Sequence, residues 1–492
     1  MSEPHGIALT PTDARASIAV DLGAESCRVS LLRWHRGQPA ITLVHRFANA
    51  PREIAGALRW DLAMIEAGLD EGLRKCAAIA TEGIRSIAVD GWAVDYVRLG
   101  ADGKPLADPF CYRDERTISS EHALHQKISP AKLRELTGIQ VLRIDTLYQL
   151  YADALAELPD SPWLNLPEYI LSRWGGAPVA EYTNATHTHL VDLSTRQWSS
   201  EIFHSAGLDL ASAPKLVPPG TQLGKLRGPL AELPAFRDTL LIAPACHDTA
   251  SAIAGIPASG NDWAYISSGT WSLVGTLLDH PQNGAAAAAE NFTNLGAAGG
   301  QICFHKNVNG MWPLRQCMDA WASQGHHWTI PDLVAAAEKI PPPQALLDVD
   351  DPDLLLAGQM PQRINAQRLR NGLPPLDERP ENAPIFASLI FHSLAAQYAK
   401  VLDRVALHSG KKLKRLFVVG GASQNDLLNR LTQQATGLEL HRGSPESSTV
   451  GNFAVQLAAL ESPSNSDTGP SAHDIAHWAH LFVAALAQPP TP

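Results

Sequence analysis

Short apolar runs separated by polar turns open the regular part of the chain. The runs cover residues 16–22, 28–34 and 40–47, and each has the length of a β-strand, which predicts a three-stranded meander. Residues 62–80 then place apolar side chains at helical spacing, and residues 86–90 form a further apolar strand. This alternation of strands and helices is typical of an α/β fold.

The same patterns predict further elements downstream. A hairpin is expected over residues 93–106, with its turn at Asp102-Gly103. Proline-rich polar sequence between residues 340 and 384 indicates an irregular surface segment with short helical pieces. Helices are predicted at residues 119–127, 130–137, 146–156, 312–322, 383–408, 424–436 and 472–486.

Two segments far apart in the chain share one local pattern. IAVDLGAESCRVSLL, residues 18–32, and YISSGTWSLVGTLL, residues 265–278, each consist of an apolar strand, a turn with glycine and hydroxyl residues, and a second strand. Glycine permits close backbone approach, so such turns can direct N–H groups and hydroxyls at an anion. A single turn of this kind is usually only a hairpin connection. Its repetition indicates two related lobes, each with a phosphate-binding turn.

The length of the chain also favours two domains. A chain of 492 residues is too long for one core and fits two domains of about 200 to 250 residues. We expect a flexible arm over residues 1–15, lobes over residues 16–245 and 246–462, and a C-terminal segment with a last helix over residues 463–492. The strand at residues 239–245 is expected to open the second half.

Charge and composition exclude several classes of function. The formal net charge of −11 argues against non-specific binding to nucleic acid or to an anionic membrane, because both need a basic surface. No run of 18 uncharged apolar residues occurs, and the start of the chain does not resemble a leader, so we expect a cytoplasmic protein that binds a small molecule. The six cysteines show no C-x-x-C spacing, which predicts buried free thiols without disulfides or zinc.

Asp248 lies where an apolar strand gives way to a short helix. The sequence HDTAS at 247–251 follows LLIAPAC, and reactive groups in α/β folds collect at such corners. Two interpretations are open, a helix N-cap or a catalytic carboxylate. In the catalytic case we expect the helix dipole to keep the group ionised. Phosphoryl transfer tolerates this, because its loose transition state needs only a carboxylate that orients a hydroxyl and accepts its proton late.

Two other places suit a nucleotide. Asp21 lies just before Gly23 in the first hairpin, where a carboxylate either holds Mg²⁺ beside phosphates or caps an Asx turn. The strand at 415–419 meets Gly420-Gly421 before a helix. A helix N-terminus and bare backbone at such a corner can face phosphate or ribose.

A third cluster suits a polyhydroxylated ligand. Asp90, Trp92 and Asp95, followed by Arg113, combine carboxylates, an aromatic plane and a cation, which match sugar hydroxyls and C–H faces. The sequence His-Thr-His at 187–189 carries less weight. As a strand it would point its imidazoles to opposite faces, which argues against a shared metal.

These segments, in this order, resemble the FGGY carbohydrate kinases, a family of the ribonuclease H/actin-like ATPase superfamily. The resemblance spans about residues 16–460. Within the family it is strongest to the kinases of L-rhamnulose. The matching segments are VDLGAESCRV at 20–29, RWD at 59–61, IAVDGWAVDYVRL at 87–99, YRDERT at 112–117, TGIQ at 137–140, DTLYQL at 145–150, EYTNAT at 181–186, HDTASA at 247–252, SSGTWSL at 267–273, KNVNGMW at 306–312, VVGGASQN at 418–425 and STVGN at 448–452.

The resemblance implies an α/β fold of two ribonuclease H/actin-like lobes with sugar and ATP in the cleft between them. Asp248 would be the base that activates the 1-hydroxyl of a ketose, and Asp21 would lie near Mg²⁺. The residues implied at the nucleotide are Asp21, Gly23, Ala24, Glu25, Ser26, Cys27, Arg28, Gly269, Thr270, Arg315, Gly420, Gly421 and Asn425. Those implied at the sugar are Asp90, Trp92, Ala93, Asp95, Arg113, His247, Thr249 and Asn307.

The implied reaction is transfer of the γ-phosphoryl group of ATP to the 1-hydroxyl of L-rhamnulose, by a monomer or homodimer. Ala93 departs from the glycine that such kinases usually have beside the sugar, and Arg315 replaces a frequent glutamine near ATP. Two alternatives stay open. One is a kinase of L-fuculose, L-xylulose or a smaller ketose, and the other, less favoured, is a non-catalytic protein that binds nucleotide or sugar.

Overall fold

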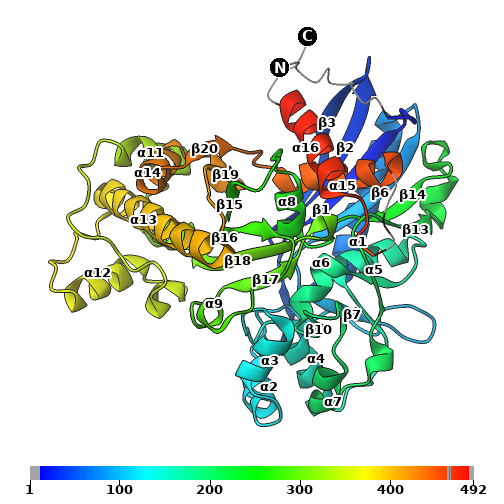
Figure 1. Cartoon of the computed structure of the whole chain (residues 1–492), viewed down its shortest axis with the longest axis horizontal. Coiled ribbons are helices and arrows are strands. Elements are labelled where there is room, and N and C mark those ends of the chain that lie inside the picture. The colour runs from blue at the N-terminus through cyan, green and yellow to red at the C-terminus, as the bar shows by residue number, and fades with distance from the viewer. Residues whose placement is uncertain (1–10, 463–464, 466, 487–492) are drawn as a thin grey trace.

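The structure is a computed structural model that describes residues 11–462, 465 and 467–486. Two six-stranded mixed sheets form the centres of two α/β lobes (Figure 1). The strand order is β13-β14-β6-β1-β2-β3 in the first sheet and β17-β18-β16-β15-β19-β20 in the second. The chain therefore has the two-lobed α/β architecture that the repeated hairpin indicated.

The first sheet combines an antiparallel meander with a parallel extension. Tight turns join β1, β2 and β3, which pair antiparallel, whereas β6 runs parallel to β1, and β14 parallel to β6. Buried aliphatic side chains of these strands pack with those of α1 in one core. The elements are β1 (Ala16–Leu22), β2 (Ser26–His35), β3 (Gln38–Ala48), α1 (Leu62–Ile79), β6 (Ile84–Gly91), β13 (Thr221–Lys225) and β14 (Leu240–Ala243).

The second sheet repeats this scheme. β15, β16 and β18 pair antiparallel, and β19 and β20 extend the sheet in parallel from β15. The hairpin β15–β16 thus corresponds to β1–β2, and β19 corresponds to β6. The strands are β15 (Trp263–Ser268), β16 (Trp271–Leu278), β17 (Thr293–Gly296), β18 (Ile302–Asn309), β19 (Arg415–Val419) and β20 (Glu439–Arg442).

The helix α13 (Ala383–Ser409) lies in the core of the second lobe. It ends at Gly410, whose φ of 69° is left-handed, a conformation that costs glycine little. The helical stretch Pro380–Ser409 is long and apolar enough to cross a membrane, yet 67% of its apolar 18-residue window is buried within the protein. Its apolar side chains therefore serve the core. The helices around it are α10 (Trp312–Ala322), α11 (Ile330–Ala337), α12 (Met360–Arg370) and α14 (Asp426–Thr436).

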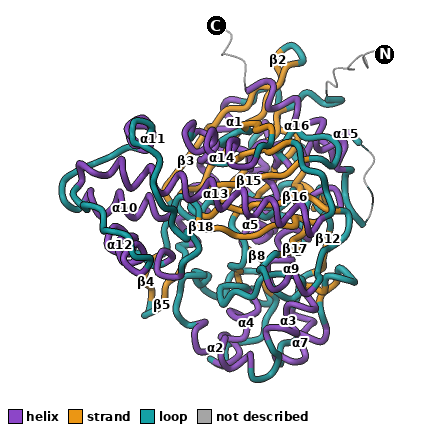
Figure 2. Tube along the Cα trace, turned by 60° about the vertical axis from the view of Figure 1, so that its left-hand side comes forward, coloured by secondary structure: helices purple, strands orange, loops and turns teal. Residues whose placement is uncertain are grey.

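A group of helices extends the first lobe beyond its sheet (Figure 2). These helices share a small core of their own, with Tyr148 and Phe203 among its members. They are α2 (Thr117–His125), α3 (Pro130–Thr137), α4 (Thr146–Leu155) and α7 (Ser200–Ala206). Shorter elements complete the chain: β4 (Arg52–Ile54), β5 (Ala57–Arg59), β7 (Tyr96–Arg98), β8 (Trp163–Asn165), α5 (Leu166–Arg173), β9 (Val179–Glu181), α6 (Tyr182–Ala185), β10 (Val191–Asp192), β11 (Gln197–Trp198), β12 (Lys215–Val217), α8 (Asp248–Ala254) and α9 (Ala285–Ala289).

The last two helices, α15 (Ser447–Glu461) and α16 (Ala472–Leu486), return to the first lobe. Phe453, Trp478 and Phe482 share an apolar core with Ala19 and Leu32 of the first sheet. α15 also crosses α8 closely, since a Cβ on Gly451 would lie 1.7 Å from the carbonyl oxygen of Ser251. A helix late in the sequence thus contacts both the first sheet and α8.

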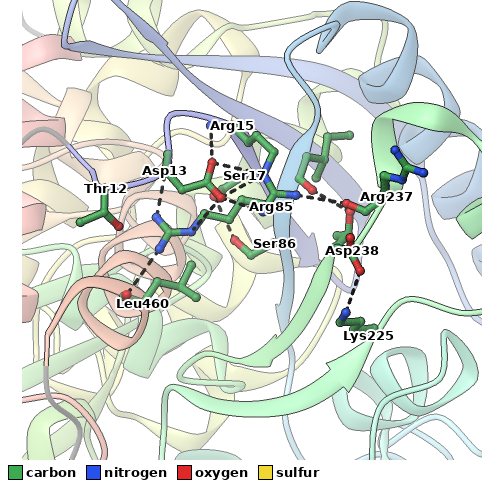
Figure 3. Close-up of polar contacts among 12 residues, drawn as sticks. Thr12, Asp13, Arg15, Ser17, Arg85, Ser86, Lys225, Arg237, Asp238 and Leu460 are labelled. Atoms are coloured by element: carbon green, nitrogen blue, oxygen red, sulfur yellow. Dashed lines mark hydrogen bonds and ion pairs between the residues drawn. The ribbon is translucent and has the colours of Figure 1, made fainter.

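The C-terminal end of α15 makes polar contacts with the first lobe (Figure 3). Arg85, at the start of β6, donates to Glu461 and to the carbonyl of Leu460 in α15, while Asp13 pairs with Arg15 (2.7 Å). Arg85 also donates to the carbonyl of Asp13 (3.5 Å), and Arg15 donates to that of Arg237 (3.1 Å), so the predicted arm over residues 1–15 is anchored to the first lobe at its inner end. Residues 1–10 of that arm, and residues 463, 464, 466 and 487–492 of the predicted C-terminal segment, lie outside the described residues.

Most predicted elements are confirmed, and two are wrong. Every predicted helix is present to within two residues at either end, and all six cysteines are buried and free. The strand expected to open the second half is β14, which belongs to the first sheet. The expected hairpin over 93–106 is reduced to its turn and a bridge between Leu99 and Pro105, because β7 pairs with β8.

Candidate active site

Asp21, Asp90 and Asp248 meet at one edge of the first sheet. Asp21 and Asp90 are neighbours in the register of the parallel strands β1 and β6. The N–H of Gly91 donates to the carbonyl of Cys246 (2.9 Å), which holds the start of α8 against the end of β6. The three carboxyl groups therefore lie at the carboxyl ends of parallel strands, where α/β proteins bind ligands.

Arg28, on β2, is a cation that these carboxyl groups share. Its guanidinium donates to Oδ2 of Asp21 (3.0 Å) and lowers the pKa of all three acids. Burial acts more strongly in the other direction: it raises the pKa of Asp21 and holds that of Asp90 well above its usual range. Among the described residues, Oδ1 of Asp90 is buried without a hydrogen-bond partner.

Asp248 is the first residue of α8, and His247 occupies the N-cap position. Burial raises the pKa of the Asp248 carboxyl to about 6, although hydrogen bonds from Thr249 and the charge of Arg28 oppose the shift. Since 37% of the side chain is exposed, water screens part of this effect. Burial thus opposes the helix dipole, yet a carboxyl group with this pKa is still mostly ionised near pH 7, which agrees with the expectation of an ionised group.

The neutral side chain of His247 lies beside Asp248, and that of His187, also neutral, lies beside His247. Nε2 of His247 is 3.3 Å from Oδ1 of Asp248, and the ring of His187 lies 3.9 Å from that of His247, between centroids. Burial lowers the pKa of His247 to about 3 and that of His187 well below its usual value. Residues 186–188 form a 3-10 turn and not the strand considered for His-Thr-His, and this turn carries His187 to its position beside His247. No pattern in the sequence marked His187 for the site.

The side chain of Trp92 is held firmly after β6. Its Nε1 donates to Oδ2 of Asp95 (3.0 Å), and its ring packs on Trp60 with 4.6 Å between centroids. The fully buried carboxylate of Asp95 also accepts hydrogen bonds from Trp60, Gln149 and the N–H of Tyr112. These contacts let Asp95 position Trp92, and the sugar contact that the resemblance implied for Asp95 stays a prediction.

The backbone between Trp92 and Asp95 is strained. Val94 has a φ of 72°, an unfavourable conformation for a β-branched residue. Its carbonyl accepts hydrogen bonds from Thr146 (2.7 Å) and Gln149 (3.2 Å). Such strain persists where surrounding contacts enforce it, and it clusters at ligand sites. Ala93 is therefore presented by a pre-formed backbone.

The turn between β1 and β2 can accept an anion. A Cβ on Gly23 would lie 2.4 Å from the carbonyl oxygen of Ser26, so only glycine fits there. The N–H groups of Ala24 and Glu25 donate no hydrogen bond within the described part of the chain. They remain available to phosphate oxygens. The thiol of Cys27 lies in the core, which leaves only its backbone near such a ligand.

The turn between β15 and β16 lies against the glycine pair after β19. Gly269 and Thr270 are exposed at its tip. Gly420 has a φ of 80°, and a Cβ there would lie 2.7 Å from the carbonyl oxygen of Ser268. Gly421 faces open space. The second hairpin and the glycine pair thus form one surface.

The loop before α15 connects the two turns. The N–H of Gly420 donates to the carbonyl of Ser444 (3.4 Å), and Glu446 lies 3.6 Å from Arg28 of the first hairpin. Because the loop is short, the phosphate-type turns of both lobes converge on it. This is the arrangement that a nucleotide held between the lobes requires.

Asn307 and Arg113 occupy different environments. Asn307, on β18 of the second lobe, donates to Gln140 of the first lobe (3.2 Å). It therefore bridges the lobes near the site. Arg113 is exposed, and its guanidinium lies 5.0 Å from the ring centroid of Tyr112, whose phenol has its pKa raised to about 12 by burial.

Asn425 and Arg315 lie on the second lobe. Asn425 caps α14 by accepting the N–H of Leu428 (3.0 Å), while its buried Nδ2 has no partner among the described residues. Arg315 is 67% exposed on α10, with Nε 3.3 Å from Asp319. Arg315 lies one turn beyond Met311, and the N–H of Met311 donates to the carbonyl of Gly269 in the second hairpin turn. The exposed guanidinium of Arg315 can therefore reach a phosphate bound at that turn.

α15 supplies residues that the sequence analysis did not assign. Ser448 donates to Oδ2 of Asp21 (2.9 Å), and Asn452 donates to Oδ2 of Asp90 (2.6 Å). Gln456 continues the row toward Ser86 (2.7 Å). Their spacing of four residues places them on one helix face. Polar residues at this spacing in an otherwise apolar helix were the signal available in the sequence.

A large cavity lies apart from the predicted site residues. It has a volume of about 1340 Å³ and is lined by Ala250 and Ile253 of α8 together with Lys411, Lys412 and His473. None of the predicted site residues lines it. The chemistry assigned to the carboxyl ends of β1 and β6 therefore does not depend on this cavity.

Comparison with known proteins identifies the family. The N-terminal domain model of the FGGY family of carbohydrate kinases matches residues 16–255, and the C-terminal domain model matches residues 264–460. A rhamnulokinase of Enterococcus faecalis is 38% identical over 91% of this chain and 90% of its own. A rhamnulokinase of Bacteroides thetaiotaomicron is 34% identical over 90% of each.

Solved structures share the fold. A ligand-bound xylulose kinase from Lactobacillus acidophilus has a TM-score of 0.72 at 16% identity, covering 96% of this chain and 97% of its own. A glycerol kinase from Plasmodium falciparum with ADP has a TM-score of 0.71 at 12% identity, covering 94% and 92%. Two family models and two relatives across nearly the whole chain show that it belongs to the FGGY family of carbohydrate kinases.

Proposed function

We propose that the protein transfers the γ-phosphoryl group of ATP to the 1-hydroxyl of L-rhamnulose, giving L-rhamnulose 1-phosphate and ADP. The observation that carries the proposal is the meeting of Asp248 with the first phosphate-type turn, through Arg28 and Asp21. The sugar is taken from the two relatives named rhamnulokinase, each matched over 90% or more of this chain.

Asp248 is assigned as the base. As the bond between the sugar O1 and the γ-phosphorus forms and the bond to the bridging oxygen of ADP breaks, the proton of the 1-hydroxyl passes to the Asp248 carboxylate. His247 is neutral, so it does not neutralise this carboxylate as an ion pair. Thr249 donates to Oδ1 (3.2 Å) and orients the group.

The nucleotide is assigned to the two turns and the glycine pair. The free N–H groups of Ala24 and Glu25 and the guanidinium of Arg28 suit phosphate oxygens from the first lobe. Thr270 and Arg315 face the same ligand from the second lobe. Gly421, which has no neighbour within 4 Å of a would-be Cβ, leaves room for adenosine.

The residues present fit Mg²⁺, which the family typically uses with ATP. Three carboxyl groups share one guanidinium, and the hydrogen bonds to Asp21 both use Oδ2, which leaves Oδ1 for an ion or its water shell. Hard carboxylate oxygens are the ligands that Mg²⁺ prefers. When bound, the ion neutralises charge on the phosphates. Asp21 is the residue we assign to it.

The sugar is assigned to the segment around Ala93, with Asn307, His247 and Arg113 around it. A second candidate, a kinase of another ketose, is favoured by Ala93 itself. The side chain is held on strained, pre-formed backbone and cannot move away from a ligand. The added methyl group therefore changes the shape of the pocket that selects the sugar.

A panel of sugars tests the choice. ADP release should be measured by a coupled assay with L-rhamnulose, L-fuculose, L-xylulose and a smaller ketose. We expect kcat/KM to be highest for L-rhamnulose by about tenfold or more, because one misplaced methyl or hydroxyl costs about 1–3 kcal/mol. A rate with L-rhamnulose no better than background, beside a good rate with another ketose, would transfer the assignment to that sugar.

The raised pKa of Asp248 predicts an acid limb in the rate. The base must be ionised, and its pKa is raised to about 6, so activity is present above that value and is lost as the pH falls through it. We expect log kcat/KM to be level near pH 8 and to fall with a slope near one toward about pH 5. A profile that stays flat across this range contradicts the assignment. Tm at each pH serves as the control for folding.

The proposed reaction also suggests where the protein works and with which partners. We place the kinase in the cytoplasm, where ATP is available, as a monomer or homodimer without a nucleic-acid or membrane partner. The burial of α13 within the second lobe supports this view.

A further inference from the structure

The chain just before Asp248 leaves the sheet, and its backbone needs other partners. β14 stops at Ala243, and although His247 still forms an isolated bridge with Gly91 of β6, the N–H groups of Cys246 and His247 bond side chains and not a strand. Buried N–H groups of this kind are costly unless paired. The N–H of Cys246 donates to Oε2 of Glu181 (2.7 Å), and that of His247 donates to Oγ1 of Thr183 (3.3 Å).

Glu181 and Thr183 act as one unit. The hydroxyl of Thr183 donates to Oε2 of Glu181 (2.5 Å), and its N–H donates to Oε1 (2.8 Å). The carboxylate thus accepts three hydrogen bonds, and these favour its ionised form although burial raises its pKa to about 8. Both side chains are fully buried, so water does not substitute for either of them.

Glu168 holds the segment that carries Glu181 and Thr183 in place. Glu168 accepts the N–H of Glu181 (3.1 Å) and the side-chain amide of Asn184 (2.9 Å). On the other side of the chain, Gly91 of β6 donates to the carbonyl of Cys246 (2.9 Å). The backbone before Asp248 is therefore held from two directions, by β6 and by the segment 181–183.

We infer that Glu181 and Thr183 are positioning residues, which fix the backbone of Cys246 and His247 and thereby aim the carboxylate of Asp248. The inference rests on the proposed role of Asp248 as base. It gives a function to the segment EYTNAT, which matched the family by sequence but had no assigned role. Reacting groups must be held closely, since a displacement of about 1 Å lowers rates by about 100-fold.

The substitution Thr183→Val tests this inference. It removes the hydroxyl and keeps the shape, so we expect kcat to fall by about 10- to 100-fold while KM for ATP changes less than about twofold. Thr183→Ser restores the hydroxyl and should recover most of kcat. Thr188→Val is the matched control, because its buried hydroxyl bonds the carbonyl of Ala185 and the N–H of Leu190 and does not reach residues 246–248.

The possible results distinguish the positioning role of Glu181 and Thr183 from the role of Asp248 as base. Equal kcat for Thr183→Val and Thr188→Val, with similar losses in Tm, would overturn the inference. Should Thr183→Val not fold, Glu181→Gln replaces it: one oxygen must then serve three donors, and an unchanged kcat overturns the inference equally. If Asp248→Asn is inactive while folded Thr183→Val keeps full kcat, only the positioning role fails. If Asp248→Asn keeps its activity, the assignment of the base fails.

Discussion

Replacement of Asp248 by asparagine should lower kcat for sugar phosphorylation by about 10²- to 10⁴-fold, the range that a positioned general base contributes. The amide keeps the size of the side chain and the position at the start of α8, but it does not accept the proton of the sugar hydroxyl. ATP binding should persist, because the two phosphate-type turns are intact. The measurements are steady-state kinetics by ADP release and calorimetric titration with ATP.

The control for this variant is Asp332→Asn. Asp332 is an exposed acid in the first turn of α11, a helix that contributes none of the assigned site residues, so its replacement changes a helix terminus without removing a group assigned to the reaction. We expect its kcat to equal that of the unmodified protein. Asp248→Asn that folds, binds ATP and phosphorylates sugar at the normal rate would remove Asp248 from the mechanism.

The second large effect is expected from Gly451→Ala. An added Cβ would lie 1.7 Å from the carbonyl oxygen of Ser251, so α15 and α8 must move apart. Overpacking of this kind costs about 1–3 kcal/mol or more, which exceeds the gain of about 0.5–1 kcal/mol that alanine brings to a helix. Because α15 carries Ser448 and Asn452 and α8 carries Asp248, activity should fall together with stability.

Thermal unfolding and kcat measured on the same preparation check this expectation. We expect Tm to fall by about 2–4 °C for each kcal/mol lost. Gly284→Ala is the matched control, since Gly284 has a φ of −66° and the nearest atom to a new Cβ is a flexible glutamine end at 3.7 Å. A Gly451→Ala protein with unchanged Tm and kcat would show that the helices do not need their close crossing.

Local chemistry accounts for what the sequence predicted correctly. Apolar spacing placed the strands and helices, and Gly410 marked the end of α13, because periodicity and glycine conformation depend on neighbouring residues only. The two hairpins were recognisable for the same reason. Asp21 and Asp248 were found as candidates because each lies at a strand end beside a turn or helix start.

Long-range packing accounts for what was missed. Ser448 and Asp21 are 427 positions apart in the chain, and Asn452 and Asp90 are 362 apart, so no local pattern connects them. The membership of β14 in the first sheet depends on its pairing with β6 across the chain. The position of His187 depends on a 3-10 turn that apolar spacing does not reveal.

The amino-acid sequence by itself determined the two-lobed α/β plan, the phosphate-type turns and the candidate base, because these arise from side-chain periodicity and backbone freedom within short segments. Only the tertiary structure decided the chemistry of that base. Its neighbours remove water from Asp248 and raise its pKa, against the effect of the helix dipole that local sequence suggests. Hydration and charge at a buried group are set by every element packed around it, and those elements come from all parts of the chain.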